Sequence, residues 1–277
     1  MNIADFDIYK DLLKGNSGLV LTQDKSYLIE SRLKPVSKKW GYDDISTMTN
    51  ILRGVPPKDL VKDIVEAMTT NETSFFRDIK PFEIFKTHVL PYYKNKLGHS
   101  KKIRIWCAAA ASGQEPYSLA MTIKEEAAKM PGFNFEIVAT DISQEILDQA
   151  KEGTYSQFEV QRGLPITHLM KYFTQNGDKW TINQDIKNMI TYKYFNLLDP
   201  MASLGKFDIV FCRNVLIYFD PPTKKDVMER INGQINDDGF FFLGGAETVL
   251  GITDVFKGIK DRRGLYAKVN SEHVKAA

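Results

Sequence analysis

Apolar side chains in the first 70 residues recur at three- and four-residue intervals, which is the spacing of amphipathic helices. Three such stripes follow one another, and a Gly-Val-Pro-Pro breaker at 54–57 separates the last two. The stripes comprise Tyr27, Leu28, Ile29 and Leu33, then Ile45, Met48, Ile51 and Leu52, then Leu60, Ile64, Val65 and Met68. Runs of β-branched residues are few here. The pattern predicts a small all-helical N-terminal domain over residues 1–70.

A connecting segment is expected over residues 71–97. Its apolar residues include Phe75, Phe76, Phe82, Phe85 and Val89. Disordered and linker segments contain few such residues, because large apolar side chains drive burial. We therefore expect a helix here that packs on a larger body.

From residue 98 to residue 277, short apolar runs alternate with helix-like stretches. The runs, read as strands, are 103–107, 135–140, 190–195, 207–212 and 239–243, with an edge strand at 265–269. The helix-like stretches are 116–129, 143–151 and 222–235, with Ser143 as an N-cap. Alternation of this kind predicts an α/β domain with a mostly parallel sheet and helices on both faces.

One interval, about 158–189, does not fit the alternation. Two short β-like runs there flank Asn176-Gly177, and Asn-Gly is the strongest short hairpin signal. We interpret this interval as a small β subdomain inserted in the α/β domain.

Composition and charge exclude several classes of protein. The 277 residues are 43% hydrophobic and 26% charged, which is ordinary for a globular chain. A net charge of +2 means that any basic surface is local, and we expect no nucleic-acid partner. Two cysteines make no disulfide framework. With no signal peptide and no apolar run of about 20 residues, we expect a cytoplasmic protein without direct membrane insertion.

The loop after the first predicted strand, Ala108–Gly113, consists of small residues, which let a backbone approach a ligand closely. It lacks both the G-x-G-x-x-G fingerprint of dinucleotide sites and the Gly-Lys-Ser/Thr of phosphate loops. A ligand of low negative charge suits it, although a tight strand-to-helix turn explains it equally well.

Polar residues also follow the other predicted strands, where open α/β sheets bind ligands. Asp141 could accept hydrogen bonds from ribose hydroxyls, or it could simply begin a helix. Asn196-Leu197 could contact an adenine, or it could form a loop turn. Arg213-Asn214 lies where a reacting centre is expected, with an ion pair as the alternative.

Five ordered sequence blocks resemble the chemotaxis receptor methyltransferases, the CheR family, over nearly the whole chain. The first, NETSFFR at Asn71–Arg77, is similar to the N-x-T-x-F-F-R signature of that family. The others are WCAAAASGQEPYSLAM at 106–121, Ala-Thr-Asp-Ile at 139–142, YFNLL at 194–198 and FCRNVLIYF at 211–219. Together these blocks are far more specific than any one of them.

The resemblance implies a class I methyltransferase, Rossmann-like fold that binds S-adenosylmethionine and releases S-adenosylhomocysteine. It implies cofactor contacts at Asn71, Thr73, Arg77, Glu115, Asp141, Asn196, Leu197, Arg213 and Asn214. The acceptors would be glutamate side chains in the cytoplasmic domain of methyl-accepting chemotaxis receptors. The family usually has Thr-Gly-Glu-Glu where this chain has Ser-Gly-Gln-Glu at 112–115, so Gln114 removes one negative charge.

Methyl transfer to a glutamate needs alignment and water exclusion more than it needs a general base. The acceptor has a pKa of about 4.3 and is already ionised at neutral pH. His88, His99, His168 and His273 accordingly fall outside the blocks. Arg77 offers a planar fork for a carboxylate of either the cofactor or the acceptor. We expect catalytic roles for Arg77 and Tyr218. Tyr218 could help to exclude water from the site and could donate a hydrogen bond to the acceptor. Core packing is the alternative for the nearby aromatic residues, above all for Phe75.

A basic helix face is expected to bind the receptor. Lys25, Arg32 and Lys39 recur every seven residues, with Lys38 beside them. A solvated helix face is the ordinary explanation, but the resemblance suggests docking on an acidic receptor helix. The β subdomain resembles one that in some relatives binds a receptor peptide by strand addition. We expect a monomer and no metal site.

Two other functions compete with an active enzyme. The chain could be a non-catalytic adaptor that binds S-adenosylmethionine and receptors, although the cofactor residues argue against this. It could methylate a small molecule, which leaves the helical domain and the β subdomain without a role. The missing glycine fingerprint disfavours a dehydrogenase.

Overall fold

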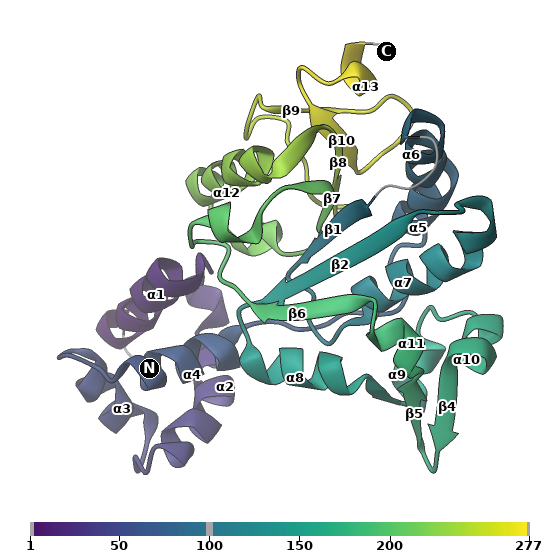
Figure 1. Cartoon of the computed structure of the whole chain (residues 1–277). Helices are drawn as coiled ribbons and strands as arrows, with labels where there is room; N and C mark the ends of the chain where they lie inside the picture. The colour runs from purple at the N-terminus through teal and green to yellow at the C-terminus, as the bar shows by residue number, and fades with distance from the viewer. Residues whose placement is uncertain (1–2, 98–101, 276–277) are drawn as a thin grey trace. The chain divides into compact units, whose positions relative to one another are not determined.

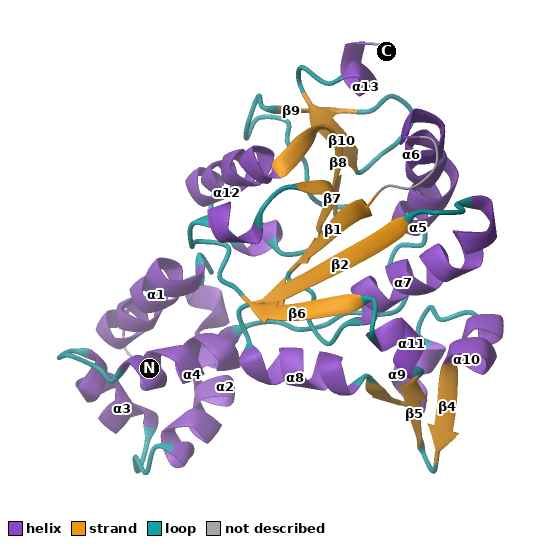
Figure 2. Cartoon of the chain, viewed as in Figure 1, coloured by secondary structure: helices purple, strands orange, loops and turns teal. Residues whose placement is uncertain are grey.

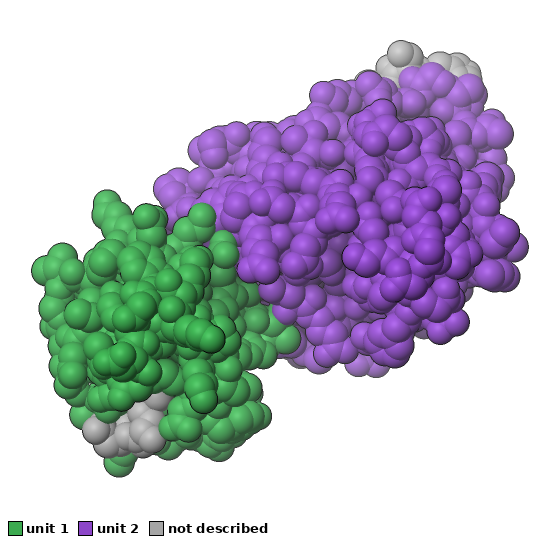
Figure 3. Space-filling model, turned by 90° about the horizontal axis from the view of Figure 1, so that it is seen from below, with its two compact units in different colours: residues 1–70, 218–224 green, residues 71–217, 225–277 purple. Residues whose placement is uncertain are grey.

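The structure, a computed structural model, describes residues 3–97 and 102–275 and divides the chain into two compact units (Figure 1). One unit comprises residues 1–70 and 218–224, and the other comprises 71–217 and 225–277 (Figure 3). The segment 71–97 thus belongs to the second unit, whereas a short stretch that contains Tyr218 belongs to the first. The boundaries predicted from the sequence stay predictions.

The first unit is helical, as its apolar stripes predict. Its helices are α1 (Ile3–Ser17), η1 (Gln23–Lys25), α2 (Ser26–Lys39), α3 (Ile45–Leu52) and α4 (Lys58–Met68). The side chains of Leu13, Ile29, Leu33, Leu60 and Ile64 are fully buried between them. Tyr27 was included in the stripe of α2 wrongly, because its side chain is 63% exposed and lies off the face that Ile29 and Leu33 bury.

The second unit contains a seven-stranded sheet (Figure 2). Its strands are β1 (Lys102–Ala108), β2 (Asn134–Asp141), β6 (Ile190–Tyr194), β7 (Phe207–Cys212), β8 (Ile235–Leu243), β9 (Phe256–Gly258) and β10 (Leu265–Lys268). The order is β6-β2-β1-β7-β8-β10-β9; the first five strands are parallel, β10 is antiparallel to β8, and β9 is antiparallel to β10. The predicted mostly parallel sheet is confirmed, and β9 adds a strand that the sequence did not reveal.

Further helices lie along this part of the chain. They are α5 (Lys80–Ile84), the π-helical η2 (Phe85–Val89), α6 (Leu90–Leu97), α7 (Gln114–Glu126), η3 (Ala127–Lys129), α8 (Gln144–Glu152), η4 (Met201–Leu204), η5 (Leu216–Tyr218), α12 (Pro221–Gln234) and α13 (Glu272–Lys275). Ser143 caps α8, as predicted, because its hydroxyl accepts the N–H of Ile146.

The direction of the strand connections places helices on both faces of the sheet. From β1 the chain steps to β2 and then to β6, so α7 and α8 share one face, where the Tyr117 hydroxyl donates to the carbonyl of Ala150. From β7 to β8 it steps the other way, and a right-handed crossover puts α12 on the opposite face. The order reverses between β1 and β7, and this is where the carboxyl ends of strands open a ligand site.

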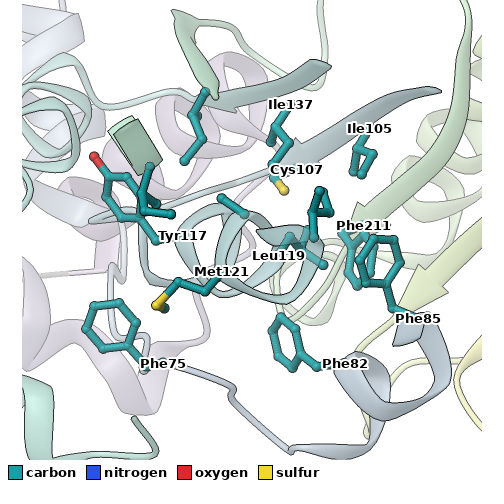
Figure 4. Close-up of a cluster of buried hydrophobic side chains, with 14 of the residues drawn as sticks. Phe75, Phe82, Phe85, Ile105, Cys107, Tyr117, Leu119, Met121, Ile137 and Phe211 are labelled. Carbon is teal, nitrogen blue, oxygen red and sulfur yellow. The ribbon is translucent and has the colours of Figure 1, made fainter. Parts of the chain in front are cut away.

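The core of the second unit lies between the sheet and the helices around α7 (Figure 4). Ile105 and Cys107 of β1 and Phe211 of β7 face Leu119 of α7, and Phe75 lies at the edge of the same cluster. Alternate residues of a strand face the same side of the sheet, so Ile105 and Cys107 are both buried against α7. These buried contacts fix the ends of the strands. The loops that follow them start from a rigid base.

The small β subdomain is present. It consists of β3 (Thr154–Ser156), α9 (Gln157–Gln161), α10 (Ile166–Tyr172), β4 (Phe173–Asn176), β5 (Lys179–Ile182) and α11 (Gln184–Lys187). β4 and β5 form the predicted hairpin, with Gly177 at a φ of +63°. β3 completes a three-stranded sheet and precedes the boundary near 158 that the sequence suggested.

No helix among the described residues combines the length and the apolar character that a bilayer crossing requires.

Candidate functional site

The central feature of the site is Arg213, the first residue after β7, whose side chain is only 1% exposed. Its Nη1 lies 2.8 Å from Oε2 of Glu115, in the first turn of α7. Its Nη2 donates to Oδ2 of Asp78 at 2.7 Å and to the carbonyl oxygen of Arg77 at 2.9 Å. Among the described residues, its buried Nε–H has no hydrogen-bond partner. The ion pair that the sequence offered as the alternative for Arg213 is therefore present, and the role of Arg213 in ligand binding stays a prediction.

Glu115 is a buried carboxylate held between opposing influences. Burial raises its pKa above the ordinary value, and the positive charges of Arg213 and, more weakly, Arg77 act to lower it. A further positive charge nearby would offset the remaining free-energy cost of burying this charged carboxylate. The site is therefore electrostatically suited to a cationic ligand.

Asp141 at the end of β2 supports the loop after β1. Its Oδ2 accepts the N–H of Ala111 at 2.9 Å, and its Oδ1 accepts the N–H of Ser143 at 3.1 Å. The carboxylate thus fixes both the loop and the start of α8.

The loop after β1 has a strained backbone that small residues permit. Ala109 and Ala111 have φ of +61° and +48°, and Gly113 has +93°. A Cβ at Gly113 would lie 2.8 Å from the hydroxyl of Tyr192 and 3.1 Å from the Cβ of Ala150. Glycine is therefore required there for close packing as well as for conformation. Gln114, which replaces the family's acidic residue, accepts a hydrogen bond from Ser112 and is buried.

The segment that carries the NETSFFR block lies at the same site. Nη1 of Arg77 donates to the carbonyl of Glu72 at 2.9 Å, and the N–H of Phe76 donates to the hydroxyl of Ser118 on α7. Phe76, Asp78 and Ile79 all have positive φ, between 49° and 67°. Non-glycine residues in this region, above all a β-branched one, are uncommon and cluster where function holds them.

The other predicted cofactor residues lie in the segment before Phe75 and in the loops after β6 and β7, and their contacts with a cofactor stay predictions. Asn71 and Thr73 are half-buried in the segment before Phe75. Asn196 and Leu197 follow β6, where Oδ1 of Asn196 accepts the N–H of Leu198 and Leu197 is buried. Asn214, with a φ of +59°, follows Arg213 directly.

Other predicted site residues are not joined to this cluster. Tyr218 is grouped with the first unit, where its carbonyl accepts the N–H of Val20 at 2.9 Å, and its catalytic role stays a prediction. Arg32 donates from Nη1 to the carbonyls of Met68 and Thr69 at the end of α4. Lys39 pairs with Asp63 at 2.8 Å, whereas Lys25 and Lys38 are exposed.

Core packing, the alternative that the sequence offered for the nearby aromatics, is found for Phe75, and the cysteines and His168 are also packed against other residues or buried. Phe75 is fully buried, with its ring edge-on to Tyr155 at 5.0 Å, and Cys107 and Cys212 are buried free thiols. His168 packs on the ring of Phe76, and burial lowers its pKa. His99 lies outside the described residues. Within the described ranges, no three His, Cys, Asp or Glu residues are placed to hold a metal ion.

Sequence reasoning missed three residues that support the site. Asp78 follows directly after the recognised block and binds Arg213. Tyr155 of the β subdomain donates its hydroxyl to the carbonyl of Ser112 at 2.7 Å. Glu247, after β8, accepts hydrogen bonds from the loop that follows Arg213. Only Asp78 had a signal, which was its adjacency to Arg77; the other two act across long sequence separations.

Comparison with known proteins supports both units. The family model described as "CheR methyltransferase, SAM binding domain" matches residues 71–265, and "CheR methyltransferase, all-alpha domain" matches residues 4–69. "Chemotaxis protein methyltransferase Cher2" of Pseudomonas putida is 39% identical over 266 residues, covering 94% of this chain and 96% of the relative. "Chemotaxis protein methyltransferase 1" of Pseudomonas aeruginosa is also 39% identical over 266 residues, covering 95% and 96%. The protein of the same name from Vibrio cholerae is 38% identical over 270 residues, covering 94% and 96%.

Proposed function

Because the chain belongs to the CheR methyltransferase family, we propose that it methylates glutamate side chains in the cytoplasmic domain of methyl-accepting chemotaxis receptors. The methyl donor is S-adenosylmethionine, and the products are a glutamate methyl ester and S-adenosylhomocysteine. The proposal includes action in the cytoplasm as a monomer. Its main support is the ion pair between the buried carboxylate of Glu115 and Arg213, next to the Arg77 segment with its positive-φ residues.

The residues fit the cofactor. S-adenosylmethionine carries a sulfonium, an ammonium and a carboxylate, and it supplies an activated methyl group when bound. Glu115 and Asp141 offer buried carboxylates, and the unpartnered Nε–H of Arg213 offers a donor. Asn196, Leu197 and Asn214 on neighbouring strand ends would complete the nucleoside side of the site.

Arg77 is the better candidate for the acceptor carboxylate. Both terminal nitrogens of Arg213 are occupied by Glu115, Asp78 and a backbone carbonyl, and its side chain is buried. Arg77 is half-buried, and one hydrogen bond to the Glu72 carbonyl fixes its direction. An arginine fork with donors to spare can align an incoming carboxylate in two-point contact.

The reaction suits a site without a general base. A glutamate oxygen forms the new bond to the methyl carbon as the methyl–sulfur bond breaks, and no proton moves. Among the described residues, the hydrogen bonds of the site join carboxylates, arginines, amides, hydroxyls and backbone groups, and none of those named above involves a histidine or a lysine. The chain therefore contributes by positioning and by excluding water, which weakens a carboxylate nucleophile.

Receptor recognition is assigned to the first unit and the β subdomain. Lys25 and Lys38 are exposed on α2 or just before it and suit an acidic receptor helix. Arg32 and Lys39 already have partners within the first unit, so they could bind a receptor only after these contacts break. The edge of β4 is the candidate for a receptor peptide.

Methyl transfer from labelled cofactor to receptor-bearing membranes tests this proposal. We expect label on the receptor that mild base releases as methanol, because esters hydrolyse and methylated amines do not. Receptor binding with no label would favour the adaptor. Label on small molecules alone would favour a small-molecule methyltransferase.

A further inference from the structure

The turn after β8, Gly244–Glu247, is joined to the loop after β7 by a single carboxylate. Oε2 of Glu247 accepts the N–H of Asn214 at 2.8 Å and that of Gly244 at 2.7 Å. Oε1 accepts the N–H of Val215 at 3.1 Å and that of Ile217 at 3.3 Å. Hydrogen bonds from N–H groups to a charged acceptor are stronger than neutral ones. Three N–H donors of the loop after Arg213 thus converge on one side chain.

Gly244 makes this arrangement possible. A Cβ at this position would lie 2.8 Å from Nδ2 of Asn214, 3.0 Å from its backbone nitrogen and 2.8 Å from Oε2 of Glu247. Real Cβ atoms essentially never approach so closely, so only glycine leaves room for the Asn214 amide. Asn214 itself has a φ of +59°, in the left-handed region that non-glycine residues rarely adopt unless their surroundings hold them there.

We propose that Glu247 is a positioning residue of the cofactor site, which fixes Arg213 and Asn214 by holding the backbone that follows them. The salt bridges described in the structure include none to Glu247, so its charge is balanced by backbone N–H groups. Arg213 stands immediately before this held backbone and reaches Glu115 on the other side of the site. The inference rests on the proposed function only in assigning Arg213 and Asn214 to the cofactor.

Glu247→Gln is the informative variant, with Glu229→Gln as its matched control. The amide keeps one acceptor oxygen but turns an NH2 group toward the other backbone donors, which cannot bond to it. Glu229, on α12, bonds only the hydroxyl of Thr253 at 3.3 Å among the hydrogen bonds described. In cofactor-free protein we expect faster hydrogen exchange at the N–H groups of Asn214, Val215 and Gly244. Calorimetry should show S-adenosylhomocysteine binding weakened by roughly tenfold, the loss expected from about one charge-assisted hydrogen bond.

Glu229→Gln should leave both measurements unchanged. If Glu247→Gln does not fold, Gly244→Ala keeps the carboxylate and displaces the Asn214 amide; it should weaken binding with a smaller change in exchange at Val215. Unchanged exchange and unchanged affinity in either folded variant would overturn the inference. Both readouts need only protein and S-adenosylhomocysteine. An effect on binding without any receptor methyl ester would therefore contradict the proposed function and uphold the role of Glu247.

Discussion

Arg213 and Glu115 form a buried ion pair, with Nη1 of the arginine 2.8 Å from Oε2 of the glutamate. The two residues come from β7 and α7, on either side of the point where strand order reverses. Asp78 brings a second carboxylate to the same guanidinium, so the first pair is not isolated. Breaking a buried pair by removing one partner leaves an uncompensated charge. The pair therefore has both a structural and an electrostatic role, and these roles can be tested separately.

Glu115→Gln is expected to weaken binding of S-adenosylmethionine and to remove its dependence on pH. In the cofactor-free protein burial raises the pKa of Glu115, so lowering the pH toward that pKa protonates the carboxylate and removes its attraction for a cation. Affinity in the wild type should therefore fall as the pH is lowered, and it should begin to fall at a higher pH than a carboxyl group with the ordinary pKa of about 4.3 would allow. Calorimetry at several pH values measures this. A parallel pH profile in the Gln variant would argue against Glu115 as the titrating group.

Arg77→Ala should reduce methyl transfer by about 100-fold or more, the usual effect of removing a donor that aligns or stabilises reacting charge. The fold should survive, because Arg213 bonds the backbone carbonyl of Arg77 and not its side chain. Arg162→Ala is the matched control, since Arg162 pairs with the side chain of Glu72, the same residue whose carbonyl Arg77 bonds. Turnover numbers with saturating cofactor and receptor decide the matter. Similar losses in both variants would mean that Glu72 and its surroundings, not the Arg77 fork, are responsible.

Charge reversal at Lys25 and Lys38 should raise the Michaelis constant for receptor and leave cofactor affinity unchanged. Both side chains are exposed, so their loss should not disturb the helices. Arg32→Glu should additionally lower the melting temperature, because Arg32 bonds two carbonyls at the end of α4 and each such bond contributes about 1 kcal/mol or more. Kinetics at two salt concentrations would also show the effect shrinking at high salt. Unaltered receptor kinetics for Lys25 and Lys38 would remove α2 as the docking face.

The ion pair between Lys14 and Asp220, 2.7 Å apart within the first unit, should make stability depend on pH. Hydrogen bonds from Lys14 and Thr223 lower the pKa of Asp220 to about 2, below the ordinary 3.8. Stability from a depressed carboxyl pKa is present above the unfolded value and is lost as the pH falls through the folded value. Asp220→Asn keeps an acceptor for the N–H of Thr223 but loses the ion pair.

Denaturant unfolding should therefore find the Asn variant less stable at neutral pH. The difference from the wild type should shrink as the pH falls from about 4 toward about 2. Lys14→Met should give the same pH dependence, since it removes the other partner. A difference that stays constant over this range would show that the pair does not set the pKa of Asp220.

The sequence predicted the fold well where apolar residues recur at a regular interval. The strands β1, β2, β6, β7 and β8 and the hairpin at Asn176-Gly177 were expected from apolar runs and turn chemistry. The three-residue strands β3 and β9 are too short to show a period, and the π-helical turn at 85–89 has no distinct residue signature. Tyr27 was wrongly included in the buried stripe of α2, because the apolar pattern of one helix does not show how much of its surface the neighbouring helices bury.

The candidate site was predictable only as a set of residue types. Asp141 and Arg213 stood out because polar residues at strand ends are informative without any contact being known. The residues that support the neighbouring loops were not visible, because Glu247 and Tyr155 lie 33 and 43 positions away in sequence from Asn214 and Ser112, to which they bond. When a side chain bonds a backbone group, the residue type of the partner also gives no signal in the sequence. The positions of Tyr218, Lys25 and Lys38 in a complex with receptor stay predictions.

The central claim is that a glutamate carboxylate receives the methyl group, and mapping the modification on the receptor tests it most directly. After incubation with labelled S-adenosylmethionine, tandem mass spectrometry of receptor peptides should locate the label on glutamate side chains. It should disappear after mild base, be strongly reduced with Arg77→Ala, and be absent when the modified glutamates are replaced by glutamine, which bears no nucleophilic carboxylate. Label found on lysine, arginine or another nitrogen, stable to base, would contradict the account.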